Sequence, residues 1–534
     1  MVTIRTVRRH ELFSMLLFFV LTYFSCWALH AYWTEAVLYI MGPINLCCSF
    51  DLYRLSFTGI LGTVFISVCI WSYYYIDVEE YYNRFIPLLV SFISRMVLLI
   101  FFSNMFMTLI GWDLLGVTSF FLIVFYKNRN CAGSGIITAL SNRLGDCLIF
   151  CVLRFYIMKD HVVVLFLLLV IRLTKRAQFP FSAWLPAAMA APTPVRALVH
   201  SSTLVTAGVF VLIRYCIYDA RFIVTIGALT LTVAGICACT QSDLKKIVAL
   251  RTISQLGIMI VSIGVHEKSI CFFHLLSHAC FKALLFLCVG IIFHTGYGRQ
   301  EFRRVGNVRT RLAVSVYCKV AIISLIGFQF TSGFIRKEQI LERLYEDELS
   351  SLIIILFLTG IGLTSIYCVK ILSNFSLDTL VGSSSNSKSV SNWFLRIPLL
   401  NLGFFSVCWG TRVTSFVNPF ILITSPVDKG LPILIISIGI VTGYLLNRSR
   451  STLFSRLFIL TPNTQILSVT PVIVGDLKTL EGFYIGSWNF PTALKSHYKV
   501  LGLGLGLIFF YILYDKLDKH CEDITLREGC EFIN

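Results

Sequence analysis

The sequence predicts an all-α polytopic membrane protein, and three observations carry this prediction. Hydrophobic residues make up 57% of the 534-residue chain and charged residues only 14%, well below the roughly 25% charged residues of a soluble domain. Apolar runs that reach the about 20 residues of a bilayer crossing recur along the whole chain. The runs are continuous, whereas the strands of a membrane β-barrel are short and alternate apolar with polar residues.

About fifteen apolar segments qualify as membrane spans by their length and pattern. They lie approximately at residues 12–31, 52–75, 86–103, 105–126, 134–157, 162–179, 194–216, 222–240, 246–266, 269–294, 312–330, 350–372, 394–416, 431–446 and 501–515. The Ser-rich stretch 373–392 is expected to be a loop. The stretch 447–500 is expected to hold a helix along the membrane surface, interrupted by prolines.

Two segments, 172–194 and 327–342, are expected to be broken helices. Each follows an apolar run and combines Gly or Pro with a lysine near membrane depth, Lys175 in the first and Lys337 in the second. Interrupted hydrophobic segments at matching positions in two halves of a chain are typical of transporters built from inverted repeats.

The chain has a net charge of +17, but we do not expect it to bind nucleic acid. Its basic residues lie between apolar runs and form no single stripe. Basic loops of this kind set membrane topology and contact anionic lipids. The 18 cysteines are scattered without a CxxC pair, which favours packed thiols over zinc or iron–sulfur ligation. No phosphate loop or dinucleotide fingerprint occurs in a suitable context, so we expect no cofactor and no metal on this chain. The N-terminus is too short for a transit peptide and is expected to be the mature one.

Ionisable side chains inside the apolar runs are the candidate functional residues. A charge at the bilayer centre costs roughly 3 kcal/mol or more, so such residues pair in the protein interior or mark ion paths. They are Asp113, Arg143, Asp146, Lys175, His200, His274, His278, Lys282, Lys337 and Glu338.

The helix expected at 269–294 carries three regularly spaced polar residues, and their spacing allows more than one interpretation. His274, His278 and Lys282 are four residues apart, so they share one helix face with about 6 Å per step, as a ladder of proton-exchangeable groups. The same pattern also fits three packed polar residues or a metal bound by the histidine pair.

The remaining candidates also have simpler interpretations. Arg143 and Asp146 fit an ordinary ion pair on one helix face. Lys175 fits a snorkelling lysine at a helix end, Asp113 a static buried carboxylate, and His200 an ordinary core histidine. Residue spacing does not decide between these interpretations and a proton path.

Several stretches resemble the antiporter-like subunits of respiratory complex I. The resemblance runs in order from about residue 51 to about residue 372, and the block at 174–209 is highly specific. The stretches are SNRLGD (141–146), TKRAQFPFSAWLPAAMAAPTPVRALVHSSTLVTAGV (174–209), SDLKKIVALRTISQLGIM (242–259), HLLSHACFKALLFL (274–287), GRQEFRRVGNV (298–308) and GFQFTSGFIRKEQIL (327–341).

This resemblance implies a fold of two inverted five-helix repeats with discontinuous helices. It divides the chain into N-terminal spans, two half-channel repeats, peripheral spans, a lateral segment and a last anchoring span. Their expected bounds are, in that order, 1–85, 86–216, 222–372, 373–446, 447–500 and 501–534.

The resemblance also implies residue roles. In the first half, Asp113 and Lys175 form the carboxylate–lysine pair, Arg143 and Asp146 tune it, and His200 links the two halves. In the second half, the central hydrated axis is formed by His274, His278 and Lys282. The terminal lysine is Lys337, with Glu338 beside it.

The implied function is proton translocation in the mitochondrial inner membrane, coupled to electron transfer from NADH to ubiquinone in other subunits. NAD, FMN, iron–sulfur clusters and ubiquinone would then sit in partner subunits, and the expected partners are other membrane-arm subunits and lipids such as cardiolipin. Two different functions stay open, a subunit of a multi-subunit sodium/proton antiporter and a purely structural membrane-arm subunit. The chain departs from the family's usual pattern at Asp113, where Glu is usual, at Arg196, where Ser is usual, and at Arg336, where a small polar residue is usual.

Overall fold

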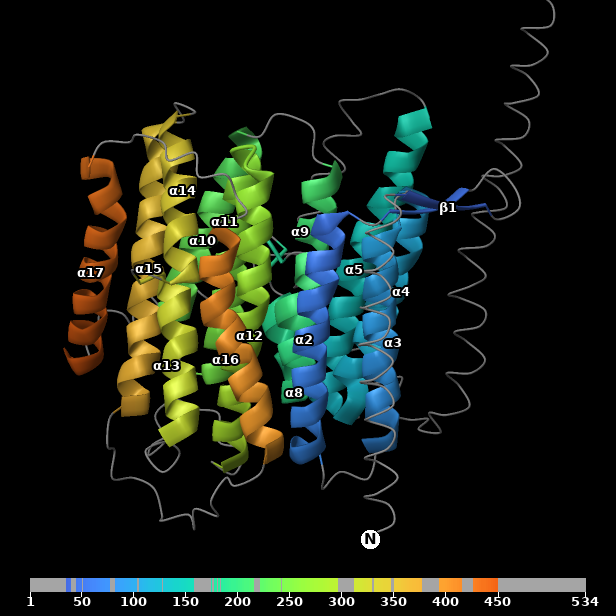
Figure 1. Ribbon diagram of the computed structural model, residues 1–534, viewed down its shortest axis with the longest axis horizontal. Coiled ribbons are helices and arrows are strands. Elements are labelled where there is room, and N and C mark those ends of the chain that lie inside the picture. The colour runs from blue at the N-terminus through green and yellow to red at the C-terminus, as the bar shows by residue number, and fades with distance from the viewer. Residues whose placement is uncertain are drawn as a thin grey trace, which may run out of the picture. The chain divides into compact units, whose positions relative to one another are not determined.

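The computed structural model is a bundle of helices that stand side by side (Figure 1). It describes residues 35–39, 45–49, 51–76, 82–102, 105–126, 128–157, 174, 177–179, 181–182, 184–215, 221–241, 243–295, 312–328, 331–346, 350–376, 393–414 and 426–449. The longer helices are α2 (Leu52–Tyr75), α3 (Tyr82–Phe101), α4 (Met105–Ile123), α5 (Arg129–Ile157), α9 (Leu204–Tyr215), α10 (Arg221–Thr240), α11 (Leu244–Gly264), α12 (Lys268–Thr295), α13 (Leu312–Ile326), α14 (Ser332–Glu346), α15 (Ser351–Ser376), α16 (Trp393–Thr414) and α17 (Pro426–Ser449).

The prediction of a multi-pass helical membrane protein is confirmed. Within the described residues, eight helices are long and apolar enough to cross a membrane, and three shorter apolar helices accompany them. The expected spans at 12–31 and 501–515, most of 162–179, and residues 450–500 of the expected lateral segment lie outside the described residues, so the count of fifteen stays a prediction. Residues 447–449 of that segment belong to helix α17.

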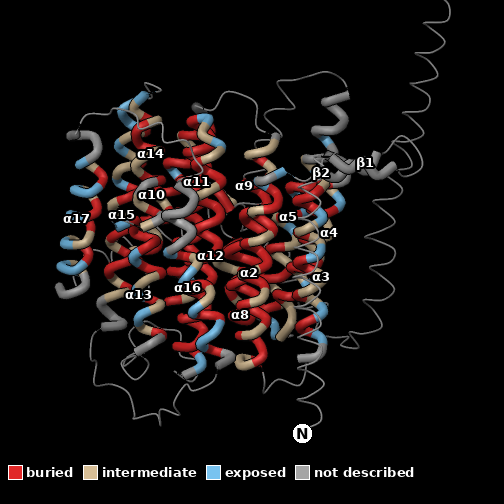
Figure 2. Tube along the Cα trace, viewed as in Figure 1, coloured by how far each residue is buried: buried red, intermediate tan, exposed pale blue. Residues whose placement is uncertain are grey.

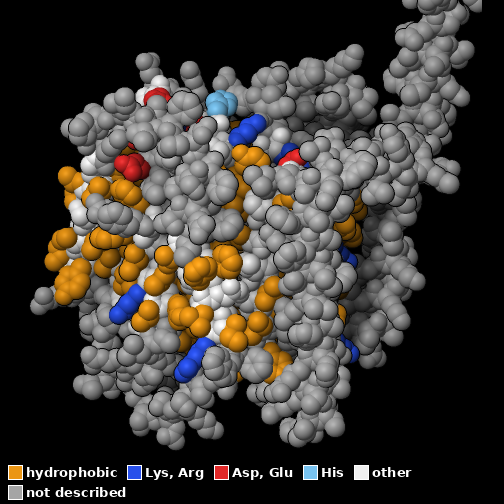
Figure 3. Space-filling view, viewed as in Figure 1, with side chains coloured by type: hydrophobic (Ala, Val, Ile, Leu, Met, Phe, Trp, Pro, Cys, Tyr) orange, Lys and Arg blue, Asp and Glu red, His pale blue; other side chains and the backbone are white. Residues whose placement is uncertain are grey.

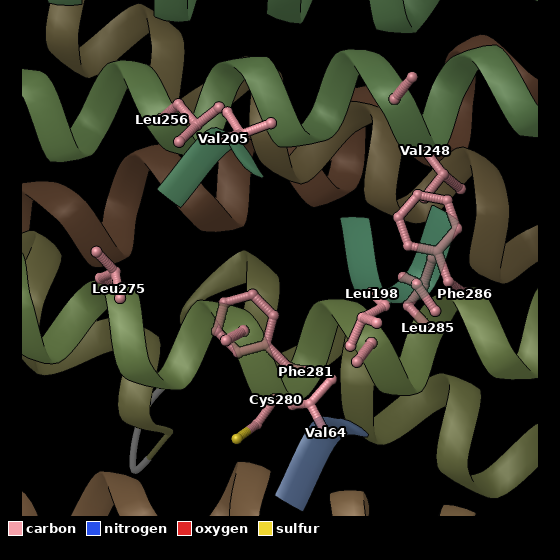
Figure 4. Packing of buried hydrophobic residues seen from close by; sticks show 14 of the residues in the cluster. Val64, Leu198, Val205, Val248, Leu256, Leu275, Cys280, Phe281, Leu285 and Phe286 are labelled. Atoms are coloured by element: carbon pink, nitrogen blue, oxygen red, sulfur yellow. The ribbon is translucent and has the colours of Figure 1, made fainter. Parts of the chain in front are cut away.

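Helices α11 and α12 form the centre of the bundle. The most apolar 18 residues of each helix are all buried (Figure 2), as expected for a segment that is hydrophobic on all sides. Helix α12 packs against α2, α11, α13, α14 and α16. Figure 4 shows labelled side chains of α2 and α11 packed around Phe281, Leu285 and Phe286 of α12. Polar residues on α12 are therefore held away from lipid.

One close approach fixes α12 against α2. A Cβ atom added to Gly290 would lie 2.7 Å from Cη2 of Trp71, a distance that real Cβ atoms do not show. The absence of a side chain at Gly290 therefore lets the fully buried indole of Trp71 pack directly on α12.

The outer helices present apolar side chains to the surroundings. Leu434, Ile438 and Val441 of α17 are each more than half exposed, and so is Phe404 of α16. On the face drawn in Figure 3, the described hydrophobic side chains cover the middle, and the acidic side chains lie near its upper edge. This is the distribution that a lipid environment favours.

A two-stranded antiparallel sheet precedes the first described helix and was not anticipated. Strands β1 (Glu35–Tyr39) and β2 (Asn45–Ser49) pair with Glu35 opposite Ser49 and Tyr39 opposite Asn45. The sequence did contain a signal for it, because a Gly-Pro turn at 42–43 lies between two short apolar runs.

Both expected breaks in the helix pattern are present. In the first, the described residues from 184 to 195 form short turns, namely α7 (Trp184–Ala187), the 3-10 turn η2 (Ala188–Ala190) and α8 (Thr193–Val195). These lead into a π-helical segment, η3 (Arg196–Thr203), which continues as α9. In the second break, α13 ends at Ile326 and α14 begins at Ser332. Each break is positioned beside one of the lysines that the sequence singled out.

Candidate functional site

Asp113 and Asp146, two acidic residues of the first half, both lie near one arginine. Arg143 of α5 places Nη1 2.7 Å from Oδ1 of Asp113 on α4, and 3.9 Å from Oδ2 of Asp146 on its own helix. The side chains of Arg143 and Asp113 are about half exposed, whereas the side chain of Asp146 is only 11% exposed. The structure thus joins three residues that the sequence singled out, with Asp113 as the closer partner of Arg143.

Lys175, the expected partner of Asp113, lies outside the described residues. Its neighbour Thr174 is buried, and the carbonyl of Thr174 accepts a hydrogen bond of 3.0 Å from Nε1 of Trp184. Ala177 has a φ of 54°, a conformation that alanine seldom adopts. This backbone turn and the indole contact hold the segment beside Lys175 against α7. The pairing of Lys175 with Asp113 stays a prediction.

His200 lies in the π-helical segment η3, which is buried throughout. Neither ring nitrogen of His200 has a hydrogen-bond partner among the described residues, and its ring centroid lies 6.5 Å from that of Trp184. Arg196, one turn earlier, donates from Nε to the carbonyl of Ala191 at 2.7 Å. A buried imidazole without a protein partner is the kind of polar group that an internal water satisfies.

The ladder on α12 forms as its spacing predicted. The ring centroids of His274 and His278 lie 6.3 Å apart, and Nζ of Lys282 donates to the carbonyl of Val248 on α11 at 3.1 Å. All three side chains are at most 1% exposed. Both nitrogens of each histidine lack a hydrogen-bond partner within the described part of the chain. No group of three or more potential metal ligands occurs in that part.

Lys337 is anchored at the break between α13 and α14. Its Nζ donates to the carbonyls of Leu325 and Ile326 at 3.1 and 2.7 Å, which caps the end of α13 with a positive charge. Gly327 follows with a φ of 74°, and the aliphatic chain of Lys337 packs against it. The side chain of Lys337 is 1% exposed. The chain reversal at Gly327 therefore aims the two carbonyls at the amine.

The two residues that flank Lys337, Arg336 and Glu338, differ in how far they are buried. Arg336 is 4% exposed, and its Nη1 donates to the hydroxyl of Ser277, which lies between His274 and His278 on α12. Glu338 is partly exposed and faces a different side of α14. Arg336 thus connects the terminal lysine's helix to the histidine ladder, a link that the sequence did not predict.

Sequence reasoning missed a second set of buried polar residues on α11 and α15. Arg251 is fully buried, and its Nη2 donates to Sγ of Cys368 at 2.9 Å. Its guanidinium carbon lies 5.2 Å from the ring centroid of Tyr367, whose hydroxyl is 3.0 Å from that of Ser254. Arg251 could have been found, because it is a charge inside an apolar run. Cys368 could not, because only the fold places it beside a cation.

Lys245, at the start of α11, was also missed. Its Nζ lies 5.4 Å from the ring centroid of Phe293 on α12, a cation–π arrangement. In the sequence, Lys245 and its neighbour Lys246 together fit an ordinary basic helix end. The structure separates the two, because Lys246 is exposed and forms an ion pair with Asp243 at 3.3 Å.

One buried cation, Arg54, pairs with a carboxylate, since its Nε lies 3.2 Å from Oδ2 of Asp51. Five others form no ion pair with a carboxylate among the described residues; they are Arg196, Arg251, Lys282, Arg336 and Lys337. Carbonyls, a hydroxyl and a thiol accept their hydrogen bonds instead. A buried charge without a counter-charge is costly unless water reaches it. Two of these five cations, Lys282 and Lys337, are amines, which can exchange a proton where water reaches them.

Comparisons with known proteins place the chain in one family. Residues 102–364 match the family model described as NADH:quinone oxidoreductase/Mrp antiporter, transmembrane part. A relative from Artemia franciscana, NADH-ubiquinone oxidoreductase chain 5, is 39% identical over 78% of this chain and 80% of its own length. The protein of that name from Lumbricus terrestris is 36% identical over 70% of this chain and 68% of its own.

Two solved structures share the fold. An Mrp complex from Dietzia sp. DQ12-45-1b superposes with a TM-score of 0.67 at 20% identity, and the match covers 91% of this chain but 58% of that one. A membrane-bound sulfane sulfur reductase, an archaeal respiratory membrane complex, gives a TM-score of 0.67 at 17% identity and covers 81% of this chain and 93% of that one.

Proposed function

The chain belongs to the family of NADH-ubiquinone oxidoreductase chain 5, and on that premise we propose that it moves protons across the membrane as a membrane-arm subunit of the respiratory complex. Membership makes it part of an oxidoreductase complex. The chain's own share is translocation, and the oxidation of NADH and the reduction of ubiquinone occur in partner subunits that hold NAD, FMN and the iron–sulfur clusters. The proposed location is the mitochondrial inner membrane.

The observation that carries this proposal is the buried ladder of His274, His278 and Lys282 at the centre of the bundle. Within a lipid-facing bundle, three uncompensated polar side chains on the most buried helix are costly to retain. Imidazole and amine groups exchange protons near neutral pH when their surroundings permit. The unpartnered histidine nitrogens supply donor and acceptor positions at which waters connect one group to the next.

The path continues from this ladder to Lys337. Arg336 contacts Ser277, which lies next to His278 of the ladder, and Lys337 follows Arg336 on α14. The amine of Lys337 meets the carbonyl ends of α13, which stabilise its protonated form without a fixed counter-charge. A lysine held in this way gains and loses a proton in response to nearby charge. We propose that it is the terminal proton site of the second half.

In the first half, the position of the charged Asp113 side chain controls when Lys175 releases its proton. Arg143 forms an ion pair with this carboxylate at 2.7 Å. When the carboxylate also approaches Lys175, it stabilises the protonated amine, and when the two separate, the amine releases its proton. The proton then moves through His200 toward the ladder on α12. Arg143 and Asp146 set how strongly Asp113 is held away from Lys175.

The proposal is tested in two steps. First, mildly solubilised source membranes are separated on a native gel and stained for NADH oxidation, and the chain is located by mass spectrometry. Comigration with the NADH-oxidising band supports a respiratory subunit, and a smaller complex without this activity points to a sodium/proton antiporter instead. Second, the proton-to-electron ratio of the intact complex in sealed vesicles is compared before and after Lys175→Met. A lower ratio with the complex still assembled supports translocation, and an unchanged ratio supports a structural subunit.

A further inference from the structure

Two buried polar atoms meet beside Gly290 of α12. They are Nε1 of Trp71 on α2 and Oγ1 of Thr193, the first residue of α8, and neither has a hydrogen-bond partner among the described residues. A Cβ atom at Gly290 would lie 2.9 Å from Cζ2 of Trp71 and 3.4 Å from Cβ of Thr193. One ring carbon separates Cζ2 from the indole nitrogen, so the N–H group lies next to this contact. Helices α2, α8 and α12 pack against one another (Figure 1), and the two unpartnered groups converge on one spot of α12.

A water molecule suits this spot. The side chains of Trp71 and Thr193 belong to residues that are 0% and 2% exposed, and a buried polar group without a hydrogen bond is costly. An indole N–H can only donate, whereas a hydroxyl both donates and accepts. An internal water that accepts from the indole and bonds to the hydroxyl satisfies both groups.

His294 lies one helical turn from Gly290, at the outer end of α12. It is exposed and is the last residue of the apolar span. Its ring centroid lies 5.4 Å from that of Tyr74 and 5.9 Å from that of Tyr75, and Tyr75 stacks on Trp71 at 4.7 Å. Four helical residues span about 6 Å. An exposed imidazole thus lies about one turn along α12 from the two unpartnered groups.

Charged side chains indicate that this end of α12 faces water. Helix α11 begins here, and Nζ of Lys245 lies 5.4 Å from the ring centroid of Phe293, the residue before His294. The exposed Lys246 pairs with Asp243 at 3.3 Å, and such charges are costly within lipid. A histidine titrates near neutral pH, so His294 is placed to take a proton from the aqueous side.

On the inner side, the segment that begins at Thr193 leads to His200. The two residues are seven positions apart on the continuous helical stretch of α8 and η3, which is at most about 10 Å along the axis. His200 is 1% exposed, and both of its ring nitrogens lack a partner in the described part of the chain. Arg196, between them, turns its Nε to the carbonyl of Ala191 at 2.7 Å. A row of about three hydrogen bonds, each about 2.8 Å long, covers the distance from Thr193 to His200.

We propose that Trp71 and Thr193 hold a water that passes protons from His294 toward His200, so that the aqueous side at the end of α12 supplies the proton path. This inference rests on the proposed function. The imidazolium of His294 loses an N–H proton to a water, which hands a proton on to the water beside Gly290. That water gives up one of its own protons toward His200, where an N–H bond forms, and His294 regains a proton from the aqueous side. No electron is transferred. Trp71 keeps its N–H and positions the water.

The water itself is tested in a density map of the intact complex at a resolution that shows ordered waters. A peak is expected within hydrogen-bond distance of both Nε1 of Trp71 and Oγ1 of Thr193. The peak is expected to be missing in Thr193→Val, whose side chain has nearly the same shape but no hydroxyl. A direct hydrogen bond between the two side chains, or a map without a peak between them, would overturn the proposal.

Proton transfer is tested in the intact complex in sealed vesicles. His294→Ala and Thr193→Val are each expected to slow transfer through this branch by about 100-fold or more and to lower the proton-to-electron ratio. Imidazole added to the medium can reach the exposed position of His294, so it is expected to restore the ratio in His294→Ala but not in Thr193→Val. Thr58→Val on α2 is the matched control, because Thr58 is also buried and its hydroxyl bonds to the carbonyl of Leu55 on its own helix. Its ratio is expected to be unchanged.

Equal ratios in Thr193→Val and Thr58→Val, or a loss in His294→Ala that imidazole does not restore, would overturn the inference. A parallel Lys337→Met variant separates this branch from the proposed function. If Lys337→Met lowers the ratio while His294→Ala and Thr193→Val leave it unchanged, the branch fails alone. If all three variants leave the ratio unchanged, the proposed function fails.

Discussion

Asp113 and Arg143 form a close ion pair between α4 and α5, with Oδ1 and Nη1 2.7 Å apart. Asp146, three residues from Arg143 on the same helix, is farther from the guanidinium at 3.9 Å. The arginine therefore bridges two carboxylates and is shared unequally. The charge around Asp113 thus involves three residues from two helices.

Arg143→Gln tests what this bridge does. Because both side chains are about half exposed, the loss of the pair is expected to cost only about 0.2–1 kcal/mol of stability, while the freed Asp113 binds Lys175 more tightly and slows proton release. The expected result is an assembled complex with reduced proton pumping, measured as the rate of acidification per NADH oxidised.

Lys246→Gln is the matched control for Arg143→Gln. It breaks the ion pair with Asp243, which is of similar length and exposure, at a residue outside the proposed path. Pumping should be normal in this variant. Similar pumping defects in both variants would show that the loss of any such ion pair is harmful and would remove the special role of Arg143.

His278→Gln tests the ladder on α12. Glutamine keeps hydrogen-bonding capacity and similar volume but does not titrate, so proton transfer through this helix is expected to slow by about 100-fold or more. A voltage-sensitive dye in sealed vesicles reports the membrane potential that NADH oxidation builds, and this potential is expected to fall.

His266→Asn is the control for this variant, because His266 is exposed between α11 and α12 and has a φ of 60°, which asparagine tolerates. It should build the full potential. A normal potential in His278→Gln would exclude proton exchange at this imidazole.

Much of the helical architecture was predictable because bilayer thickness sets the length of each apolar run. The span expected at 52–75 is helix α2, and the one expected at 269–294 is contained in α12. The two breaks were predictable because proline, glycine and lysine punctuate the runs. The π-helical form of η3 was not, because a shift from i→i−4 to i→i−5 bonding leaves no mark in residue type.

The candidate site was predictable only along single helices. The row from His274 to Lys282 follows from helical spacing alone. The contacts of Arg251 with Cys368 and of Arg336 with Ser277 join residues 117 and 59 positions apart, and only tertiary packing creates them. The β1–β2 pair was missed because strands of five residues are too short to stand out among long apolar runs.

Gly327→Ala tests how the helix break supports Lys337. At a φ of 74°, a Cβ atom costs about 1–2 kcal/mol, and it also crowds the backbone of Gly333 and the side chain of Lys337. We expect a lower temperature of thermal inactivation of the complex together with weaker pumping, since the carbonyls of Leu325 and Ile326 no longer face the amine.

Gly430→Ala on α17 is the control for this glycine. A Cβ atom there meets nothing within 4 Å, so the change should be neutral or stabilise the helix by about 0.5–1 kcal/mol. An unaffected Gly327→Ala variant would mean that the turn does not position Lys337.

The central claim is that this chain translocates protons, and Lys337→Met in the intact complex tests it most directly. The measurement is the number of protons moved per electron in sealed vesicles, compared with Lys319→Met, which replaces an exposed lysine on the neighbouring helix α13. The account predicts a lower ratio for Lys337→Met and an unchanged ratio for Lys319→Met, with both complexes assembled. An unchanged ratio in assembled Lys337→Met complex would contradict it.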